Sequence, residues 1–167
     1  MIKQESIKFV NRFFTPFAVL VVLSGVLFGE PSLFAVKISL SILSFTMLFN
    51  AATSYLSKAL RDDMMLLSRV RLLVNFTMNV FLVFHLGMYW KPIWLLFVLT
   101  PVATAIYNTA ERTLATCVIT TIVLVLVYFV KGLSSAAEWG EVVNNLLFIY
   151  VISLFVNRLV RTYEKNR

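Results

Sequence analysis

The stretch TLATCVITTIVLVLVYFV, residues 113–130, is an uncharged and mostly apolar run that decides the class of the fold. The hydrocarbon core of a bilayer is about 30 Å thick and an α-helix rises about 1.5 Å per residue, so about 20 such residues cross it. A helix also satisfies its backbone hydrogen bonds within the segment, as a lipid surrounding requires. The run therefore predicts a membrane-spanning helix.

Five further apolar runs of comparable length surround this one in the chain of 167 residues. They cover residues 13–29, 31–57, 72–90, 92–110 and 142–157. The first run stops at Glu30-Pro31, because a residue that precedes proline disfavours the helical conformation. Together the six runs predict an all-α, polytopic membrane bundle of six transmembrane helices, organised as a single domain over residues 1–167.

Composition excludes an ordinary soluble domain. Hydrophobic residues make up 60% of the chain and charged residues 14%, against the roughly 25% of charged residues usual in soluble domains. Fifteen Lys and Arg against eight Asp and Glu give a net charge of +7. In a soluble domain this excess would suggest nucleic acid, whereas in a membrane protein it first indicates orientation.

The basic residues divide unevenly between the two sides of a six-span topology. Twelve lie on the side of the N-terminus, and only Lys37, Lys91 and Lys131 lie on the other. Without the last span the division would be eight against seven. Because cytoplasmic loops carry an excess of Lys and Arg, we expect six spans in a bacterial inner (plasma) membrane with both termini in the cytoplasm. The charge there fits anionic lipid or an acidic protein partner, and we expect no nucleic acid.

The longest predicted loop, residues 58–71, leaves two interpretations open. Its apolar residues recur at three- and four-residue spacing, which is typical of a short amphipathic helix lying on the membrane. Alternatively, both neighbouring helices extend past the membrane and anchor Arg69 and Arg71 at the level of the phosphates.

Polar side chains within the spans are the candidates for an interior site, because an unpaired polar group is costly in lipid. Asn75 and Asn79 share one helix face with Arg71. Such a stripe joins helices through amide hydrogen bonds or lines a polar path, and we expect the joining role. The candidate interior or helix-contact residues are Asn50, Asn75, Asn79, His85, Pro101, which should kink its span, and Asn108.

Basic side chains near the cytoplasmic ends of the spans are candidates for contact with lipid or with a protein partner. They are Arg61, Arg69, Arg71, Arg158 and Arg161. The last two lie on a basic helix predicted to continue beyond the sixth span.

Sequence patterns of enzymes and cofactor sites are missing. There is no HExxH, GxSxG, CxxC or glycine-rich phosphate loop. A single histidine, His85, argues against haem or a metal site, and no lysine lies in the middle of a span to form a retinal Schiff base. Cys117, the only cysteine, is interpreted as a packing residue. We expect neither enzymatic activity nor a cofactor.

One part of the chain resembles a known family. Arg71-Leu72-Leu73 opens the third span, Gly87 and Pro92 mark the outer turn, and Arg112 opens the fifth span. The fourth span carries Pro101, Ala103 and Ala105. These features resemble the six-helix membrane input domain of bacterial sensor histidine kinases and related signalling proteins. No phosphorylatable histidine box or nucleotide-binding domain accompanies them, so the resemblance implies a membrane module that phosphorylates nothing by itself.

The expected function is therefore a non-enzymatic, sensor-like or scaffolding role through contacts with membrane or cytoplasmic protein partners. Formation of a homo-oligomer stays open. The basic helix at residues 151–165 could present a face to such a partner. The alternative is a small-solute transporter, or the membrane substrate-binding subunit of one, which would need a cavity joining Asn50, Asn79 and Asn108.

Overall fold

Six α-helices and one 3-10 helix make up the described part of the chain. The computed structural model describes residues 2–59, 64–133 and 135–165. The elements are α1 (Ile2–Phe28), α2 (Leu33–Ala59), α3 (Met64–Leu86), η1 (Lys91–Leu95), α4 (Leu96–Tyr107), α5 (Ala110–Val130) and α6 (Ala136–Lys165). No strand occurs within these ranges, which confirms the all-α prediction.

Four helices are long and apolar enough to cross a membrane. The segments concerned are Leu33–Leu56, Leu66–Leu86, Ala110–Val130 and Ala136–Lys165. The first and fourth predicted spans correspond to shorter apolar helical segments, Phe13–Phe28 and Lys91–Tyr107. The chain is thus a helical protein with the hydrophobic segments of an integral membrane protein.

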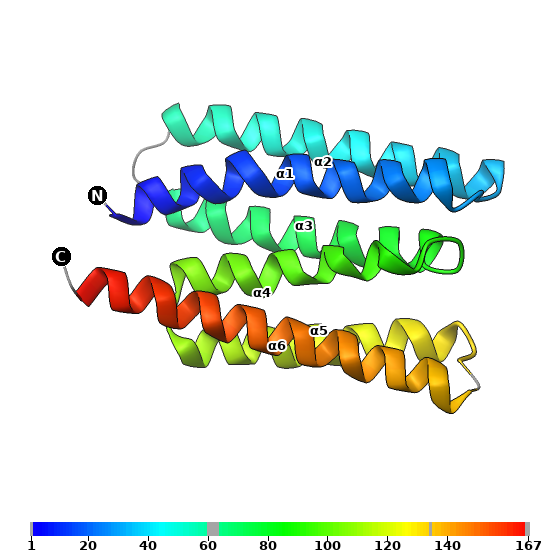
Figure 1. Ribbon diagram of the computed structural model, residues 1–167. Coiled ribbons are helices and arrows are strands. Elements are labelled where there is room, and N and C mark those ends of the chain that lie inside the picture. The colour runs from blue at the N-terminus through cyan, green and yellow to red at the C-terminus, as the bar shows by residue number, and fades with distance from the viewer. Residues whose placement is uncertain (1, 60–63, 134, 166–167) are drawn as a thin grey trace. The chain divides into compact units, whose positions relative to one another are not determined.

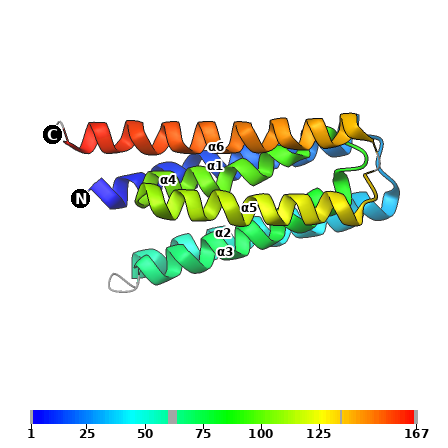
Figure 2. The same cartoon turned by 90° about the horizontal axis from the view of Figure 1, so that it is seen from below.

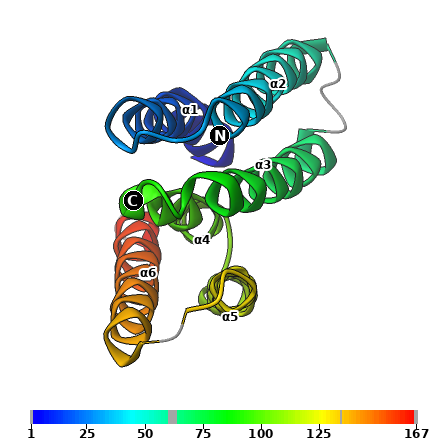
Figure 3. The same ribbon diagram turned by 90° about the vertical axis from the view of Figure 1, so that its right-hand side faces the viewer.

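The chain divides into two compact units, which we describe separately. One unit comprises residues 11–96, and in it α2 and α3 pack against each other as an antiparallel hairpin (Figure 1). The other combines residues 97–165 with the start of α1, and in it α5 and α6 form a second antiparallel hairpin (Figure 2). Figure 3 views α5 nearly along its axis, with α6 beside it.

The described residues of the region 58–71 agree with one part of the second interpretation, the extension of both neighbouring helices. Helix α2 continues to Ala59, and α3 already begins at Met64 and runs without interruption into the third predicted span. The expected anchoring of Arg71 at the phosphates is not what the structure shows, because Arg71 contacts α2.

Helix α1 ends where the sequence predicts. The N–H of Gly29 donates to Gly25 O at 3.1 Å and closes the last turn. Glu30 then adopts a left-handed conformation with φ of 48°, and Pro31 follows. A Cβ on Gly29 would lie 2.5 Å from Gly25 O and 3.0 Å from Tyr89 O, so only glycine permits this close approach.

The buried face of the second hairpin is partly polar. On α5 the buried residues are Thr113, Cys117, Thr120, Leu124 and Val127, and on α6 they are Val142, Asn145, Ile149, Ser153 and Asn157. Both sets recur at three- and four-residue spacing, so each forms one stripe along its helix. Thr113 and Asn157 end these stripes near the short connection between α4 and α5.

Candidate functional site

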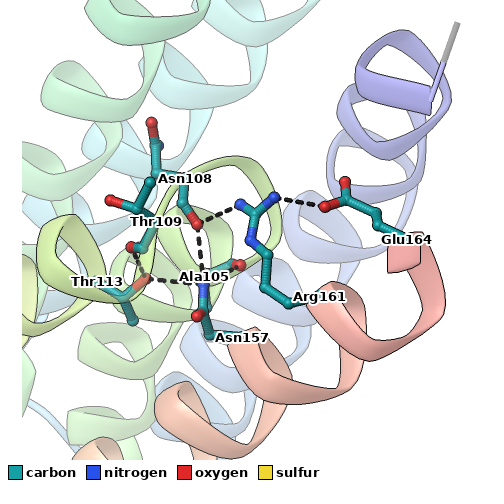
Figure 4. A network of polar contacts seen from close by, with 7 residues as sticks. All are labelled: Ala105, Asn108, Thr109, Thr113, Asn157, Arg161 and Glu164. Atoms are coloured by element: carbon teal, nitrogen blue, oxygen red, sulfur yellow. Dashed lines mark hydrogen bonds and ion pairs between the residues drawn. The ribbon is translucent and has the colours of Figure 1, made fainter. Parts of the chain in front are cut away.

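Asn157 of α6 lies at the centre of a network of polar contacts (Figure 4). Its side chain is 3% exposed. The amide Nδ2 donates to Ala105 O at 2.8 Å, to Asn108 O at 2.9 Å and to Thr113 Oγ1 at 3.3 Å. One amide group thus connects α6 with the end of α4 and the start of α5.

The acceptors are available because α4 ends there. The last carbonyl groups of an α-helix have no N–H partner within the helix. Helix α4 ends at Tyr107, and the oxygens of Ala105 and Asn108 lie at this end. The side chain of Asn157 therefore satisfies backbone groups that the chain reversal between α4 and α5 leaves free.

Arg161, one turn beyond Asn157, also contacts the end of α4. Its guanidinium donates to Asn108 O and forms an ion pair with Glu164 (Figure 4). A cation at the C-terminal end of α4 also interacts favourably with the helix dipole. Asn108, a predicted interior residue, is half-buried, and its Oδ1 accepts a hydrogen bond of 3.2 Å from Arg112.

An open groove of about 590 Å³ adjoins this cluster. It is lined by Thr109, Ala110, Leu154, Asn157, Arg158 and Arg161. Arg158 is exposed, and within the described part of the chain its guanidinium has no hydrogen bond or ion pair. The groove therefore combines an apolar side chain with one fixed and one unengaged guanidinium group.

A second polar contact joins α2 and α3 in the other unit. Arg71 donates from Nε to Asn50 Oδ1 at 2.9 Å and from a terminal nitrogen to Ser54 Oγ at 2.8 Å. Asn50 is 5% exposed. The sequence made Arg71 a candidate for lipid or partner contact and Asn50 a candidate interior or helix-contact residue. The structure places both in one contact between α2 and α3.

The predicted role of Asn79 in joining helices is matched by a hydrogen bond. Its Nδ2 donates to Leu96 O at 3.1 Å, which connects α3 to the junction of η1 and α4. Asn75 is half-buried, and its Oδ1 is buried without a hydrogen-bond partner in the part of the chain that the structure describes. The two asparagines of the predicted stripe thus differ in their surroundings.

The remaining predicted residues lie apart from these contacts. His85 is half-buried and meets Phe84 edge to face, with ring centroids 5.5 Å apart. Pro101 is buried inside α4, where its missing N–H leaves the carbonyl group four residues earlier without its helical donor. Arg69 is exposed, and Arg61 lies outside the described residues.

Some buried polar atoms of the second hairpin have no hydrogen-bond partner among the described residues. They are Thr120 Oγ1 and Asn145 Nδ2. Neighbouring threonines behave differently, since Thr113 and Thr121 each donate to the carbonyl group four residues earlier. Thr121 also contacts the hydroxyl group of Tyr150 at 3.3 Å, across the α5–α6 interface.

Sequence reasoning missed Asn157 as a site residue, although its spacing offered a signal. Asn145, Ser153 and Asn157 share a helix face at multiples of four residues, as a buried polar stripe requires.

Across the described ranges, no group of three or more His, Cys, Asp and Glu could hold a metal ion. The clusters described above are suited to joining helices and to binding anions. No known protein family, curated protein or solved structure matches the chain.

Proposed function

We propose that the chain is a non-enzymatic integral membrane protein that acts as a sensor-like or scaffolding module, by contact between its cytoplasmic helix ends and a partner protein. The observation that carries the proposal is the use of its polar side chains. Arg71, Asn79 and Asn157 all connect helices through hydrogen bonds. Such contacts fix the arrangement of helix ends, which is the property a docking module needs.

The proposed topology has six spans, with both termini in the cytoplasm. The 12 residues of α4 rise about 18 Å, and the five residues of η1, at the steeper 3-10 rise, add about 10 Å. Their sum approaches the thickness of the hydrocarbon core. Phe13–Phe28 would rise about 24 Å. A difference of a few Å between the length of a helix and the thickness of the hydrocarbon core costs little free energy.

The charge distribution supports the same topology. If only the four longer segments crossed, basic residues would divide ten against five instead of twelve against three. The larger asymmetry agrees better with the excess of Lys and Arg in cytoplasmic loops.

Helix α6 provides the surface for the proposed contact. Its 30 residues rise about 45 Å, which exceeds the hydrocarbon core by about 15 Å. The helix past Asn157 exposes Leu159 to 57% and Tyr163 to 61%. This part of α6 resembles the helix that leads from a sensor input domain into a cytoplasmic signalling segment.

Photo-crosslinking in cells tests the proposal. A photoreactive amino acid at Leu159 is expected to give a discrete adduct with another protein. The same group at Val143, which is 53% exposed on α6 but far from the proposed cytoplasmic end, serves as the control and should give no such adduct. Adducts with lipid alone at both positions would contradict the proposal.

A second candidate function is transport of a small solute, and one specific observation favours it. On the α5–α6 interface, Thr120 and Asn145 hold buried polar atoms that have no hydrogen-bond partner among the described residues. In a transporter, unpaired polar groups at the middle of the membrane receive the solute or coupling ion. A membrane-impermeant thiol reagent should then modify Asn145→Cys but not Ile149→Cys, its buried neighbour on the same stripe. Protection of both positions would exclude a water-filled path here.

A further inference from the structure

We propose that the groove between the α4–α5 connection and α6 binds the phosphate group of an anionic phospholipid. The groove has a volume of about 590 Å³, within the range of small-molecule sites. Its lining belongs entirely to one compact unit. The inference does not depend on the proposed protein partner, and it holds for four or six spans because α6 crosses the membrane in both.

The positive charge of the groove comes from two arginines, of which one is held by hydrogen bonds and an ion pair and the other is not. Arg161 is held in place by Asn108 O and is partly neutralised by Glu164 (Figure 4). Arg158 is exposed and has no hydrogen bond or ion pair within the described ranges. Glu111 and Arg112 in the first turn of α5 carry opposite charges. Arg158 is therefore the cation of the groove lining whose guanidinium is available to a phosphate group.

The order of side chains along α6 matches the order of groups in a lipid. Leu154, Arg158 and Arg161 follow one another on successive turns, separated by about 4.5 to 6 Å along the axis. Leu154 lies on the side of the apolar segment, where acyl chains are found. The guanidinium groups lie past Asn157, at the level expected for lipid phosphates.

These features favour a lipid over a free phosphate ion. Basic pockets between transmembrane helices on the cytoplasmic side are suited to anionic headgroups. Guanidinium groups bind phosphate oxygens with paired, charge-assisted hydrogen bonds. A free ion would use the arginines but would leave the apolar end of the groove, formed by Leu154, without a contact.

Binding of phosphatidylglycerol to the purified full chain in detergent tests the proposal, with native mass spectrometry as the readout. Arg158→Gln is expected to weaken binding about tenfold, since the loss of a charge-assisted hydrogen bond to a phosphate oxygen corresponds to about this factor. Lys165→Gln removes the same charge from the same helix outside the groove and should change binding less than twofold. Phosphatidylcholine should bind more weakly than phosphatidylglycerol to the unmodified chain.

Two results would overturn the proposal. Equal losses in Arg158→Gln and Lys165→Gln would indicate attraction by net charge alone. Displacement of phosphatidylglycerol by inorganic phosphate at equal concentration would indicate a site for the free ion. Because Arg158 is exposed and unengaged, an unchanged melting temperature of Arg158→Gln is expected and separates loss of binding from loss of folding.

Discussion

Asn157 donates hydrogen bonds to three groups outside its own helix, although it lies near the end of a span. We predict that Asn157→Ala lowers the free energy of unfolding by about 1 to 3 kcal/mol, because carbonyl groups at the end of α4 lose their donor. Reversible unfolding in mixed micelles measures the change. Asn144→Ala is the matched control, since Asn144 is exposed on the same helix and gains the same helix propensity. Similar effects of the two substitutions would contradict the assigned role.

Arg71 should be coupled energetically to Asn50. Arg71→Lys replaces a planar fork by a single ammonium group, which cannot reproduce the paired hydrogen bonds to Asn50 and Ser54. A double-mutant cycle of Arg71→Lys with Asn50→Ala is expected to give a coupling energy of about 0.5 to 2 kcal/mol. The same cycle with Asn79→Ala should be additive, because Asn79 binds Leu96 O instead. Coupling in the control cycle alone would refute the pairing.

The sequence indicated which kinds of polar side chain would make contacts between helices, but it did not indicate which groups they would bind. Asn79 was expected to join helices, and it does so through a backbone carbonyl group. Asn157 was overlooked because its acceptors are oxygens 44 to 52 residues earlier, and sequence spacing reveals only neighbours on one helix. For Arg71, one of two open interpretations was an anchor at the level of the lipid phosphates, whereas the structure pairs it with Asn50 and Ser54. Its pairing depends on the packing of α2 against α3.

At the scale of elements, hydropathy located the helices but underestimated the lengths of some of them. Residues 113–130 were predicted and α5 covers Ala110–Val130, and residues 142–157 were predicted and α6 covers Ala136–Lys165. The difference arises because apolar composition marks only the hydrophobic segment, while the helix continues through more polar residues. The start of α6 has its own signal, a capping box in which Ser135 and Glu138 exchange hydrogen bonds.

Two residues at helix ends have the left-handed backbone conformation, and substituting them should change the free energy of unfolding in opposite directions. Glu30 has φ of 48° and Gly132 has φ of 78°. Glu30→Gly is expected to raise the free energy of unfolding by about 0.5 to 1 kcal/mol, and Gly132→Ala to lower it by about 1 kcal/mol. A Cβ added to Gly132 would meet no atom within 4 Å, so the effect of Gly132→Ala would come from the backbone alone.

Thermal unfolding of the purified chain measures both effects. The control is Gly140→Ala, because Gly140 lies inside α6 with open space around it and alanine favours the helix there. Gly140→Ala should therefore stabilise the protein while Gly132→Ala destabilises it. Stabilisation by both alanine substitutions would show that Gly132 is not held in the left-handed conformation.

At the scale of the whole molecule, the membrane topology decides on which side each connection lies. With six spans, Met88 and Ala137 both lie outside and Thr162 lies inside. With the four longer segments alone, Met88 and Thr162 share one side and Ala137 lies on the other. The connection between α3 and η1 therefore distinguishes the two topologies.

Single cysteines at Met88, Ala137 and Thr162, all exposed positions, make the distinction measurable. A membrane-impermeant maleimide added to intact cells should label Met88→Cys and Ala137→Cys, and should label Thr162→Cys only after the cells are permeabilised. The native Cys117 is buried and should stay unlabelled, so it need not be replaced. Protection of Met88→Cys together with labelling of Ala137→Cys would contradict six spans, because η1 and α4 would then leave the membrane on the side they entered.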